Sequence, residues 1–381
     1  MRNYDIASVW GIPIRINISL IVFLPVLAWL IGSGEQIAFY ADIIDGFAPA
    51  TLDRDALAAG NTPWLVGSAA AVGLFASVAV HELGHAWAAR RYGIHTESIT
   101  LWLLGGLASL QSMPREWNRE LWIALAGPAA SVVTAAACYA VVLALPGSVP
   151  VATFVFGWLV VTNVVLTVFN LLPAFPMDGG RVLRALLARS QPYATATRTA
   201  ARIGSLFALG FAILGVLSFS PLLLLLALFV YAAATSESRL VALDALLDGV
   251  TAADAMTAGV EGVAADESIS ALLDRMMTER RTTYPVTEAG SVVGVVSLGD
   301  LRAKRNREAT TVGQVVDAEV PRVERDLPLF EVIALMNRSG ADAAVVEERG
   351  ETVGVITAAD LATALQVRRE AGSLVSPRAA M

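Results

Sequence analysis

Long stretches in which nearly every residue is apolar alternate with short polar segments over the first 236 residues. A helix needs about 20 apolar residues to cross the hydrocarbon core of a bilayer. The pattern therefore predicts six membrane-spanning helices, at residues 18–31, 64–89, 121–145, 151–172, 203–219 and 221–234. A cleaved signal peptide is the competing interpretation of the first stretch, but no clear cleavage site follows it.

The segments beside the first two predicted helices are more polar. Residues 12–18 alternate isoleucine with polar residues, which indicates a short interfacial strand. Residues 34–63 carry five acidic side chains against one arginine, and we expect a loop there. Residues 94–120 contain short β-like runs around Gly105-Gly106, which predict strands and loops at the membrane edge, shielded by protein.

The placement of arginine indicates the orientation of these helices, because Lys and Arg are enriched in cytoplasmic loops. The arginines outside the apolar stretches fall on one side of the membrane, apart from Arg54 in the acidic segment 34–63, which falls on the other side. Both termini are then cytoplasmic in a multi-pass protein of the cell membrane. The arginines that set this orientation are Arg2, Arg15, Arg90, Arg91, Arg115, Arg119, those within 181–202, and Arg239.

Residues 240–381 have the composition of a soluble domain and contain an internal repeat with an offset of sixty residues. Residues 284–301 resemble residues 343–361, and a helix is predicted before each copy, at 268–279 and 327–338. Each repeat thus reads as helix, strand, turn, strand and helix. The predicted fold class is a polytopic α-helical membrane protein, with about six transmembrane helices and a C-terminal soluble α/β domain.

The expected divisions of the chain follow from this pattern. They are a membrane domain at 1–236, a linker helix at 237–250, two repeats at 251–308 and 309–368, and a flexible tail at 369–381.

The chain is 56% hydrophobic and only 16% charged, whereas a soluble globular chain has about a quarter charged residues. Its net charge of −7 and lack of a basic block argue against nucleic acid as a partner. Cys138 is the single cysteine, which excludes an internal disulfide and a cysteine-based zinc site.

One predicted helix carries an unusual group of ionisable residues. His81-Glu82-Leu83-Gly84-His85 follows the uncharged stretch 64–80 and reads H-E-x-x-H. Four residues apart on a helix, His81 and His85 share one face and can bind one metal ion, with the Glu82 carboxylate beside it. So short a pattern also arises by chance. In an apolar helix, however, ionisable side chains need partners and by default indicate a functional site.

A catalytic zinc ion usually has three protein ligands and an open position for water. Asp178 is the strongest candidate for the third ligand, because this lone carboxylate follows the broken end of an apolar stretch. The alternative is that Asp178 caps a helix that begins near Arg181. His95 is the only other histidine, and it lies in a loop, where a solvated residue is the simpler interpretation.

At these residues the chain resembles the site-2 protease family of intramembrane zinc metalloproteases. The motifs are H-E-L-G-H at 81–85 and N-L-L-P-A-F-P-M-D-G-G at 170–180, and the resemblance covers residues 1–236. It implies regulated intramembrane proteolysis, the hydrolysis of peptide bonds in or near transmembrane segments of membrane protein substrates in the lipid bilayer. It also implies one Zn²⁺ per chain bound by His81, His85 and Asp178, a catalytic Glu82, and Asn170 and Pro176 in the substrate cleft.

The resemblance also bears on how a substrate is cleaved. Glu82 would take a proton from water and pass it to the leaving amine. A substrate helix hides its peptide bonds in hydrogen bonds, so it must unwind locally and could then pair as a strand with residues 94–112. No PDZ-like insertion separates the predicted helices, so substrate presentation differs from that of family members that carry one.

The repeat in the second half resembles tandem cystathionine-β-synthase-type (CBS) domains. This implies that ATP or another adenine nucleotide binds and regulates the protease, and that CBS domains can form a homodimer. The motif G-x-x-S-x-x-D at 294–300 recurs as G-x-x-T-x-x-D at 354–360, and the implied nucleotide-binding residues are Ser297, Asp300, Thr357 and Asp360. The alternative is that both aspartates cap helices that begin at Leu301 and Leu361. A helical linker at 237–248 would carry a shift from nucleotide to membrane domain.

A CBS-regulated transporter or channel is the main competing function. Such a protein places ionisable residues in several spans, whereas here they gather at 81–85 and at 178. A structural metal site without catalysis is the other alternative. Replacement of Glu82 discriminates between these possibilities, because a structural site keeps its metal and its function without that carboxylate.

Overall fold

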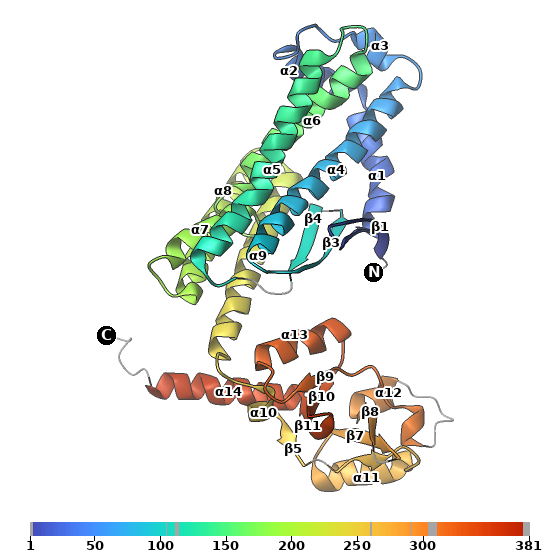
Figure 1. Ribbon diagram of the computed structural model, residues 1–381, viewed down its shortest axis with the longest axis vertical. Coiled ribbons are helices and arrows are strands. Elements are labelled where there is room, and N and C mark those ends of the chain that lie inside the picture. The colour runs from blue at the N-terminus through green and yellow to red at the C-terminus, as the bar shows by residue number, and fades with distance from the viewer. Residues whose placement is uncertain are drawn as a thin grey trace. The chain divides into compact units, whose positions relative to one another are not determined.

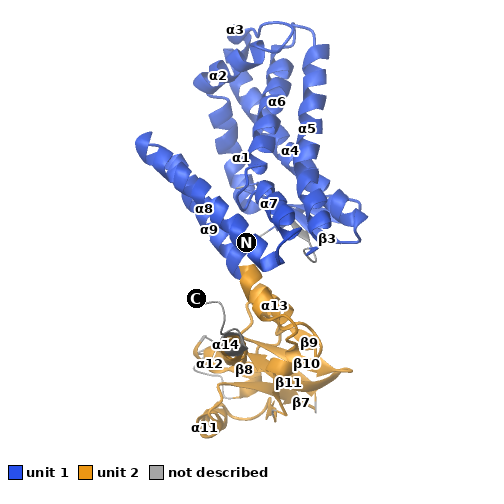
Figure 2. Cartoon of the chain, turned by 90° about the vertical axis from the view of Figure 1, so that its left-hand side faces the viewer, with its two compact units in different colours: residues 1–239 blue, residues 240–381 orange. Residues whose placement is uncertain are grey.

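The computed structural model describes residues 3–103, 105–110, 114–259, 261–289, 291–303 and 311–375. The chain divides into two compact units, Met1–Arg239 and Leu240–Met381 (Figure 2). Each unit contains its own clusters of buried apolar side chains. Arg2 and the predicted boundary at 308–309 lie outside the described residues.

The first unit is built mainly from helices (Figure 1). Among the described residues, five helices are long and apolar enough to cross a membrane: α4 Thr62–Arg91, α5 Trp117–Ala144, α6 Pro150–Asn170, α8 Tyr193–Leu217 and α9 Pro221–Leu246. The pair α1 Ile18–Ile31 and α2 Gly34–Asp45, bent by 69°, makes a sixth candidate. The predicted number of apolar helices is therefore confirmed, and most of the predicted linker helix is the end of α9.

The loop predicted at 34–63 is wrong, because α2 and the short α3 Arg54–Ala58 occupy much of that segment. Ile37, Ala41 and Ile44 of α2 recur at helical spacing and are buried, in the same core as Phe154 of α6. Asp42 lies on the exposed side of this helix. The acidic composition thus concealed an amphipathic helix.

The helix predicted to begin near Arg181 begins instead at Asp178, and it is α7 Asp178–Ala188. Gly179 and Gly180 disfavour a helix by propensity, but the tertiary contacts require them. A Cβ atom on Gly179 would lie 2.3 Å from the carbonyl oxygen of Leu172, and one on Gly180 would lie 2.7 Å from the carbonyl carbon of Ala174. The first turn of α7 therefore packs directly against the backbone that precedes it.

A four-stranded sheet in the described part of this unit lies beside α4 (Figure 1). Its strands, in spatial order, are β1 Asn3–Val9, β2 Ile12–Asn17, β3 Thr96–Trp102 and β4 Gly105–Leu110. β2 and β3 are parallel, and the other neighbours are antiparallel. The buried residues Ile14 and Ile99 share a core with Phe75 and Val78 of α4. The strand predicted at 12–18 is confirmed.

Small residues allow the helices to approach closely. A Cβ atom on Gly67 of α4 would lie 1.9 Å from the carbonyl oxygen of Ala28 in α1. A Cβ atom on Gly84 would lie 2.6 Å from the carbonyl oxygen of Ala126 in α5. No larger side chain fits at either point without displacing a helix, as in many membrane helix contacts. The Gly84 contact places α5 directly against the turn that carries His81 and His85.

The second unit contains two similar halves. The first half is α11 Ile269–Glu279, β7 Thr283–Glu288, β8 Ser291–Ser297 and α12 Leu298–Ala303. The second half is α13 Leu329–Ser339, β10 Ala343–Glu348, β11 Glu351–Thr357 and α14 Ala358–Val375. Their hairpins have matching registers, because Val286 pairs with Gly294 and Val346 pairs with Gly354, with an irregularity after each pair. The predicted repeat of helix, strand, strand and helix is therefore observed.

Shorter elements complete this unit, namely α10 Ala252–Ala255, β5 Thr257–Ala258, β6 Val263–Ala264, a 3₁₀ turn at Val312–Gln314, and β9 Arg322–Glu324. The described sheet orders are β6-β7-β8 and β5-β11-β10-β9. α14 continues to Val375, so the tail predicted to be flexible is helical over 369–375, while 376–381 lie outside the described residues.

Candidate active site

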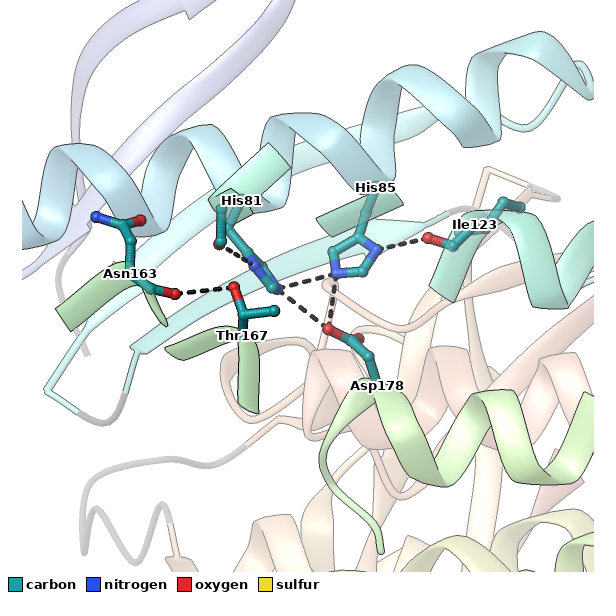
Figure 3. Close-up of polar contacts among 7 residues, drawn as sticks. His81, His85, Ile123, Asn163, Thr167 and Asp178 are labelled. Atoms are coloured by element: carbon teal, nitrogen blue, oxygen red, sulfur yellow. Dashed lines mark hydrogen bonds and ion pairs between the residues drawn. The ribbon is translucent and has the colours of Figure 1, made fainter. Parts of the chain in front are cut away.

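The helix α4 supplies the first two residues of the site. His81 and His85 lie one turn apart and are 4% and 5% exposed. Their two Nε2 atoms are 3.2 Å apart, so both rings converge on one point, as Figure 3 shows. The apolar residues on either side would exclude water from this point, which makes the burial of two imidazoles costly unless each has a partner.

Asp178, the first residue of α7, completes the cluster. Its Oδ2 atom lies 3.1 Å from His81 Nε2 and 3.2 Å from His85 Nε2 (Figure 3). The carboxylate is buried, and one potential ligand atom from each of the three residues lies within 4.8 Å of the others. Two imidazole nitrogens and one carboxylate oxygen form a donor set typical of zinc. The residues therefore fit a zinc ion with three protein ligands.

Hydrogen bonds to the other ring nitrogens orient both histidines. His85 Nδ1 donates to the carbonyl oxygen of Ile123 in α5 over 2.7 Å, and because a carbonyl only accepts, Nδ1 carries the proton. Nε2 of His85 is then unprotonated in the neutral ring and available to a metal. His81 Nδ1 is 2.9 Å from Ser131 Oγ, also in α5. Such outer contacts raise the basicity of metal-binding histidines and hold their rings in place.

Gly127 of α5 faces the same nitrogen atoms. A Cβ atom at this position would lie 2.2 Å from His85 Nε2 and 2.7 Å from His81 Nε2. Any side chain here would therefore occupy the space in which the three donors meet. The sequence alone indicates no role for Gly127 or Ser131. A glycine next to a proline within an apolar helix was the available signal, but it does not indicate which helix lies opposite.

Glu82 lies next to the histidines and against the sheet. A Cβ atom on Gly106 of β4 would lie 2.5 Å from Glu82 Cγ and 2.8 Å from Glu82 Oε1. The glycine thus lets the backbone of β4 pass directly beside this half-buried carboxylate. β4 is an edge strand of the sheet among the described strands. Glu82 therefore lies beside β4, a strand that pairs with β3 on one side and with no described strand on the other.

The two residues expected in a substrate cleft occupy different surroundings. Asn170 is the half-buried last residue of α6, and Pro176 is exposed two residues before Asp178. In the described part of the chain, no hydrogen bond joins Asn170 to His81, His85 or Asp178. A role for Asn170 and Pro176 in substrate binding thus remains a prediction. His95 is exposed and stands apart from the cluster of potential ligands.

A further polar residue that sequence analysis did not single out lies near the cluster. Asn163 of α6 is fully buried, and its Nδ2 donates to Ser77 Oγ over 3.0 Å. Ser77 is one turn before His81 in α4. Thr167 Oγ1 donates to the carbonyl oxygen of Asn163 over 2.8 Å (Figure 3). An asparagine in an apolar helix was the signal that could have identified this position.

In the second unit, the candidate nucleotide residues form two local pairs. Ser297 donates to Asp300 from its backbone nitrogen over 2.8 Å and from its hydroxyl over 2.6 Å. Thr357 donates to Asp360 in the same way, over 2.8 Å and 2.7 Å. Each pair caps the start of a helix, but the hydroxyl residue stands before the helix and the aspartate is its third residue, whereas the alternative interpretation expected the aspartate itself as the N-cap. The capped helices begin at Leu298 and Ala358, three residues before the predicted Leu301 and Leu361, because the hydroxyl residue holds the first turn.

The surroundings of these two pairs differ in charge. A cavity of about 210 Å³ adjoins the second pair, lined by residues that include Thr257, Arg280, Arg281, Thr282, Thr357 and Asp360. Thr257 Oγ1 also donates to Asp360 Oδ1 over 3.0 Å. Beside the first pair, a Cβ atom on Gly299 would lie 3.3 Å from Ser297 Oγ and 3.5 Å from a carboxylate oxygen of Asp342. One pair thus faces two arginines, and the other faces a carboxylate.

Two family models match this chain. Peptidase family M50 matches residues 69–155 and 148–211, and the CBS domain matches residues 252–306 and 312–367. Zinc metalloprotease MJ0392 of Methanocaldococcus jannaschii is 33% identical over 367 residues, which are 96% of this chain and 97% of that protein. The solved site-2 protease from Methanocaldococcus jannaschii is 32% identical, with a TM-score of 0.42, and the match covers 62% of this chain and 96% of that one.

Proposed function

We propose that this chain, which belongs to peptidase family M50, the site-2 protease family of zinc metalloproteases, hydrolyses peptide bonds in or near transmembrane segments of membrane protein substrates. The observation that carries this proposal is the convergence of three buried ligands, His81 and His85 of the apolar helix α4 and Asp178 of α7, in a multi-pass membrane protein. Substrates that reach this site come from the bilayer. Cleavage there would serve regulated intramembrane proteolysis.

The side chains around the site have separable roles in this reaction. His81, His85 and Asp178 would hold a zinc ion, which would supply the Lewis acidity that favours attack of water on a peptide carbonyl. Glu82 accepts a proton from the attacking water and later delivers it to the leaving amine. Ser131 holds the ring of His81, so that Nε2 faces the centre of the site. Asn170 is placed on the helix before Asp178, where it could donate to the substrate backbone.

The edge strand β4 supports a mode of substrate presentation. A transmembrane helix must unwind before its peptide bonds can be cleaved, and an unwound segment needs partners for its backbone groups in an apolar environment. β4 offers an edge directly beside Glu82, because Gly106 brings its backbone against that carboxylate. We infer that the substrate pairs with β4 as an added strand. A side chain at Gly106 would also displace Glu82, so the pairing is tested on the substrate instead. N-methylation of backbone amides beside the scissile bond should lower the cleavage rate, and an unchanged rate would argue against this pairing.

The protease assignment is tested by cleavage of a purified model substrate in proteoliposomes. Glu82→Gln is expected to retain zinc and to lose at least about 100-fold in cleavage rate, because general acid–base catalysis typically contributes that much. His81→Ala, His85→Ala and Asp178→Ala are expected to lose both zinc and cleavage. Equal zinc content in wild type and Asp178→Ala would remove Asp178 from the ligand set, and full activity of Glu82→Gln would refute the catalytic role.

The orientation proposed for the chain places both termini in the cytoplasm, since the arginines outside the apolar helices favour that side. Cysteine introduced at Ala59 should react with an impermeant thiol reagent in intact cells. Cysteine introduced at Ala289 should be protected until the cells are opened. The opposite pattern of labelling would invert the orientation.

A second function, binding of an adenine nucleotide, is proposed for the CBS pair. The cavity beside Thr357 and Asp360 combines a ribose acceptor and hydroxyls with Arg280 and Arg281, which suit phosphate. Beside Ser297, the Asp342 carboxylate would repel phosphate. We therefore propose that one nucleotide binds per chain, in the cavity next to Asp360, and that it modulates the protease.

Calorimetry on the full chain in micelles, with ATP, ADP and AMP, tests this binding. Asp360→Ala and Arg281→Ala should weaken binding at least about tenfold, as expected for loss of a charge-assisted contact. Asp300→Ala is the matched control and should change affinity little. No binding of any of the three nucleotides would refute the site, and a stoichiometry of two would refute the single-cavity assignment.

A homodimer through the CBS domains is also expected, and analytical ultracentrifugation of the same sample tests it.

A further inference from the structure

Arg184 of α7 is completely buried, which is rare for an arginine. Its Nε and Nη2 atoms lie 2.7 Å and 2.6 Å from Glu120 Oε1, in the first turn of α5. Its Nη1 atom donates to Glu237 Oε1 of α9. Glu237 is 31% exposed at its side chain, whereas Glu120 is 4% exposed. One guanidinium therefore joins three helices of the membrane unit.

The same guanidinium also lies close to two aromatic rings. Its central carbon lies 5.0 Å from the ring centroid of Phe175 and 5.0 Å from that of Tyr193. Phe175 belongs to the segment just before Asp178, and Tyr193 is the first residue of α8. Distances of this size place a cation favourably over aromatic rings. Arg184 thus also contacts the segment that leads into the metal-binding carboxylate.

An apolar side chain would satisfy these packing requirements without the cost of taking a guanidinium out of water. Buried charged groups are often no more stabilising than apolar residues of similar size, and their best-attested use is to select one arrangement among several. Here the arrangement concerns α7, an eleven-residue helix that carries Asp178 at its first position and Arg184 six residues later. Because α7 is short and regular, a shift of Arg184 would move Asp178 with it.

Glu237 of α9, the second ion-pair partner of Arg184, links the position of α7 to that of α9. α9 runs without a break from Pro221 to Leu246, so it continues past Arg239, where the first compact unit ends. Glu237 lies two residues before that end. Any movement of α9 along or around its axis would change the pairing of Glu237 with Arg184. α5, which supplies Ser131 and Ile123 to the histidines, is held by the same guanidinium through Glu120.

We propose that Arg184 is a positioning residue for Asp178, and that its ion pair with Glu237 makes the geometry of the metal site depend on the position of α9. This rests on the proposed metal site, and it names the contact through which α9 would act on that site. An alternative role is a purely structural one, in which the ion pairs hold helices together without affecting the metal ligands.

Zinc affinity of the full chain in micelles, measured by competition with a chelator, separates these roles. Arg184→Lys keeps the charge but loses the planar fork that reaches two carboxylates. Loss of residues that orient metal ligands typically weakens metal binding about 10- to 100-fold. We expect Arg184→Lys to lie in that range and Glu237→Gln to weaken zinc binding at least about fivefold. The double variant should be no weaker than Arg184→Lys, because both changes act through one contact.

Glu116→Gln is the matched control, since it removes an exposed ion pair with Arg119 of 2.7 Å at the start of α5. It should leave zinc affinity within about twofold of wild type. A lower melting temperature with unchanged zinc affinity in Glu237→Gln would show a structural role only and overturn the proposal. Glu237→Gln still decides the question if Arg184→Lys fails to fold, since Glu237 is partly exposed.

The same assay separates failure of this inference from failure of the proposed function. If Asp178→Ala binds zinc as tightly as wild type, the proposed metal site is wrong. If Asp178→Ala loses zinc while Glu237→Gln and Arg184→Lys keep wild-type affinity, the metal site stands and the coupling through Arg184 is wrong.

Discussion

Two groups of polar residues, one in each compact unit, contrast in how much they reveal about function. In the membrane unit, His81, His85 and Asp178 come from two helices and meet where all three are buried. In the second unit, Asp300 and Asp360 bond to hydroxyl residues three positions away in their own chain segment. Stabilising the start of their own helix is enough to explain the aspartates of the second group. The first group joins two different helices, and no such role within one segment explains it.

The difference follows from the cost of placing a polar group. In an apolar helix, an unpaired imidazole or carboxylate is expensive, so its presence requires a partner and indicates function. At the surface of a soluble domain, an aspartate at the start of a helix is inexpensive and common. A short motif therefore supports a stronger functional conclusion in the membrane unit than in the CBS pair. There, the neighbouring charges of Arg281 and Asp342 provide the discriminating observation.

The largest effect that would sharpen this contrast is expected from Gly127→Ala. A methyl group has no room 2.2 Å from His85 Nε2, so the ligands must move. A displacement of about 1 Å at a catalytic site can cost about 100-fold in rate, and cleavage in proteoliposomes should fall by at least that factor. Gly210→Ala in α8 is the control, because its Cβ would meet nothing within 4 Å. Wild-type activity in Gly127→Ala would show that the ligands meet elsewhere.

A smaller loss is expected from Ser131→Ala, which removes the hydroxyl 2.9 Å from His81 Nδ1. Residues that orient a metal-binding histidine are worth about 10- to 100-fold in metal affinity. Chelator competition should show this loss while the protein remains folded. Ser205→Ala is a suitable comparison, since Ser205 Oγ donates only to the carbonyl oxygen of Ala201 among the described residues. Similar zinc affinity in both variants would contradict the orienting role.

The smallest effect is expected in the second unit, from a cap that resembles those at Asp300 and Asp360. Thr251 donates to Asp254 from its backbone nitrogen over 2.8 Å and from its hydroxyl over 2.9 Å. Asp254→Ala should lower the free energy of unfolding of this unit by about 1 kcal/mol at neutral pH. Zinc content and cleavage should not change. Thermal unfolding of the full chain measures the shift, and the exposed Asp266→Ala is the control.

The pH dependence of that cap has a defined sign. Hydrogen bonds from Thr251 lower the pKa of Asp254 below its ordinary value. The carboxylate therefore stabilises the folded state above the unfolded pKa of about 3.9, and this contribution is lost as the pH falls through the folded pKa. The difference between wild type and Asp254→Ala should shrink below about pH 4. A difference that persists unchanged at low pH would exclude the ionised cap as its source.

The sequence by itself determined the features that depend on local composition and spacing. Apolar length identified the helices that can cross a membrane, and the sixty-residue repeat identified the CBS pair. The spacing of His81 and His85 predicted their shared helix face, and the broken helix end singled out Asp178. These predictions succeed because periodicity and the cost of buried charge act within one segment.

Only the tertiary structure decided which distant residues meet. His81 and Asp178 are 97 residues apart in the sequence. Arg184 of α7 pairs with Glu120 of α5 and with Glu237 of α9. Gly106 and Gly127 are identifiable as functional only once Glu82 and the histidines are seen against them. The amphipathic α2 was likewise hidden by its acidic residues until its buried face was seen against α6. Such contacts depend on how helices pack, and packing is set by the shapes of both partners, which no single segment of sequence contains.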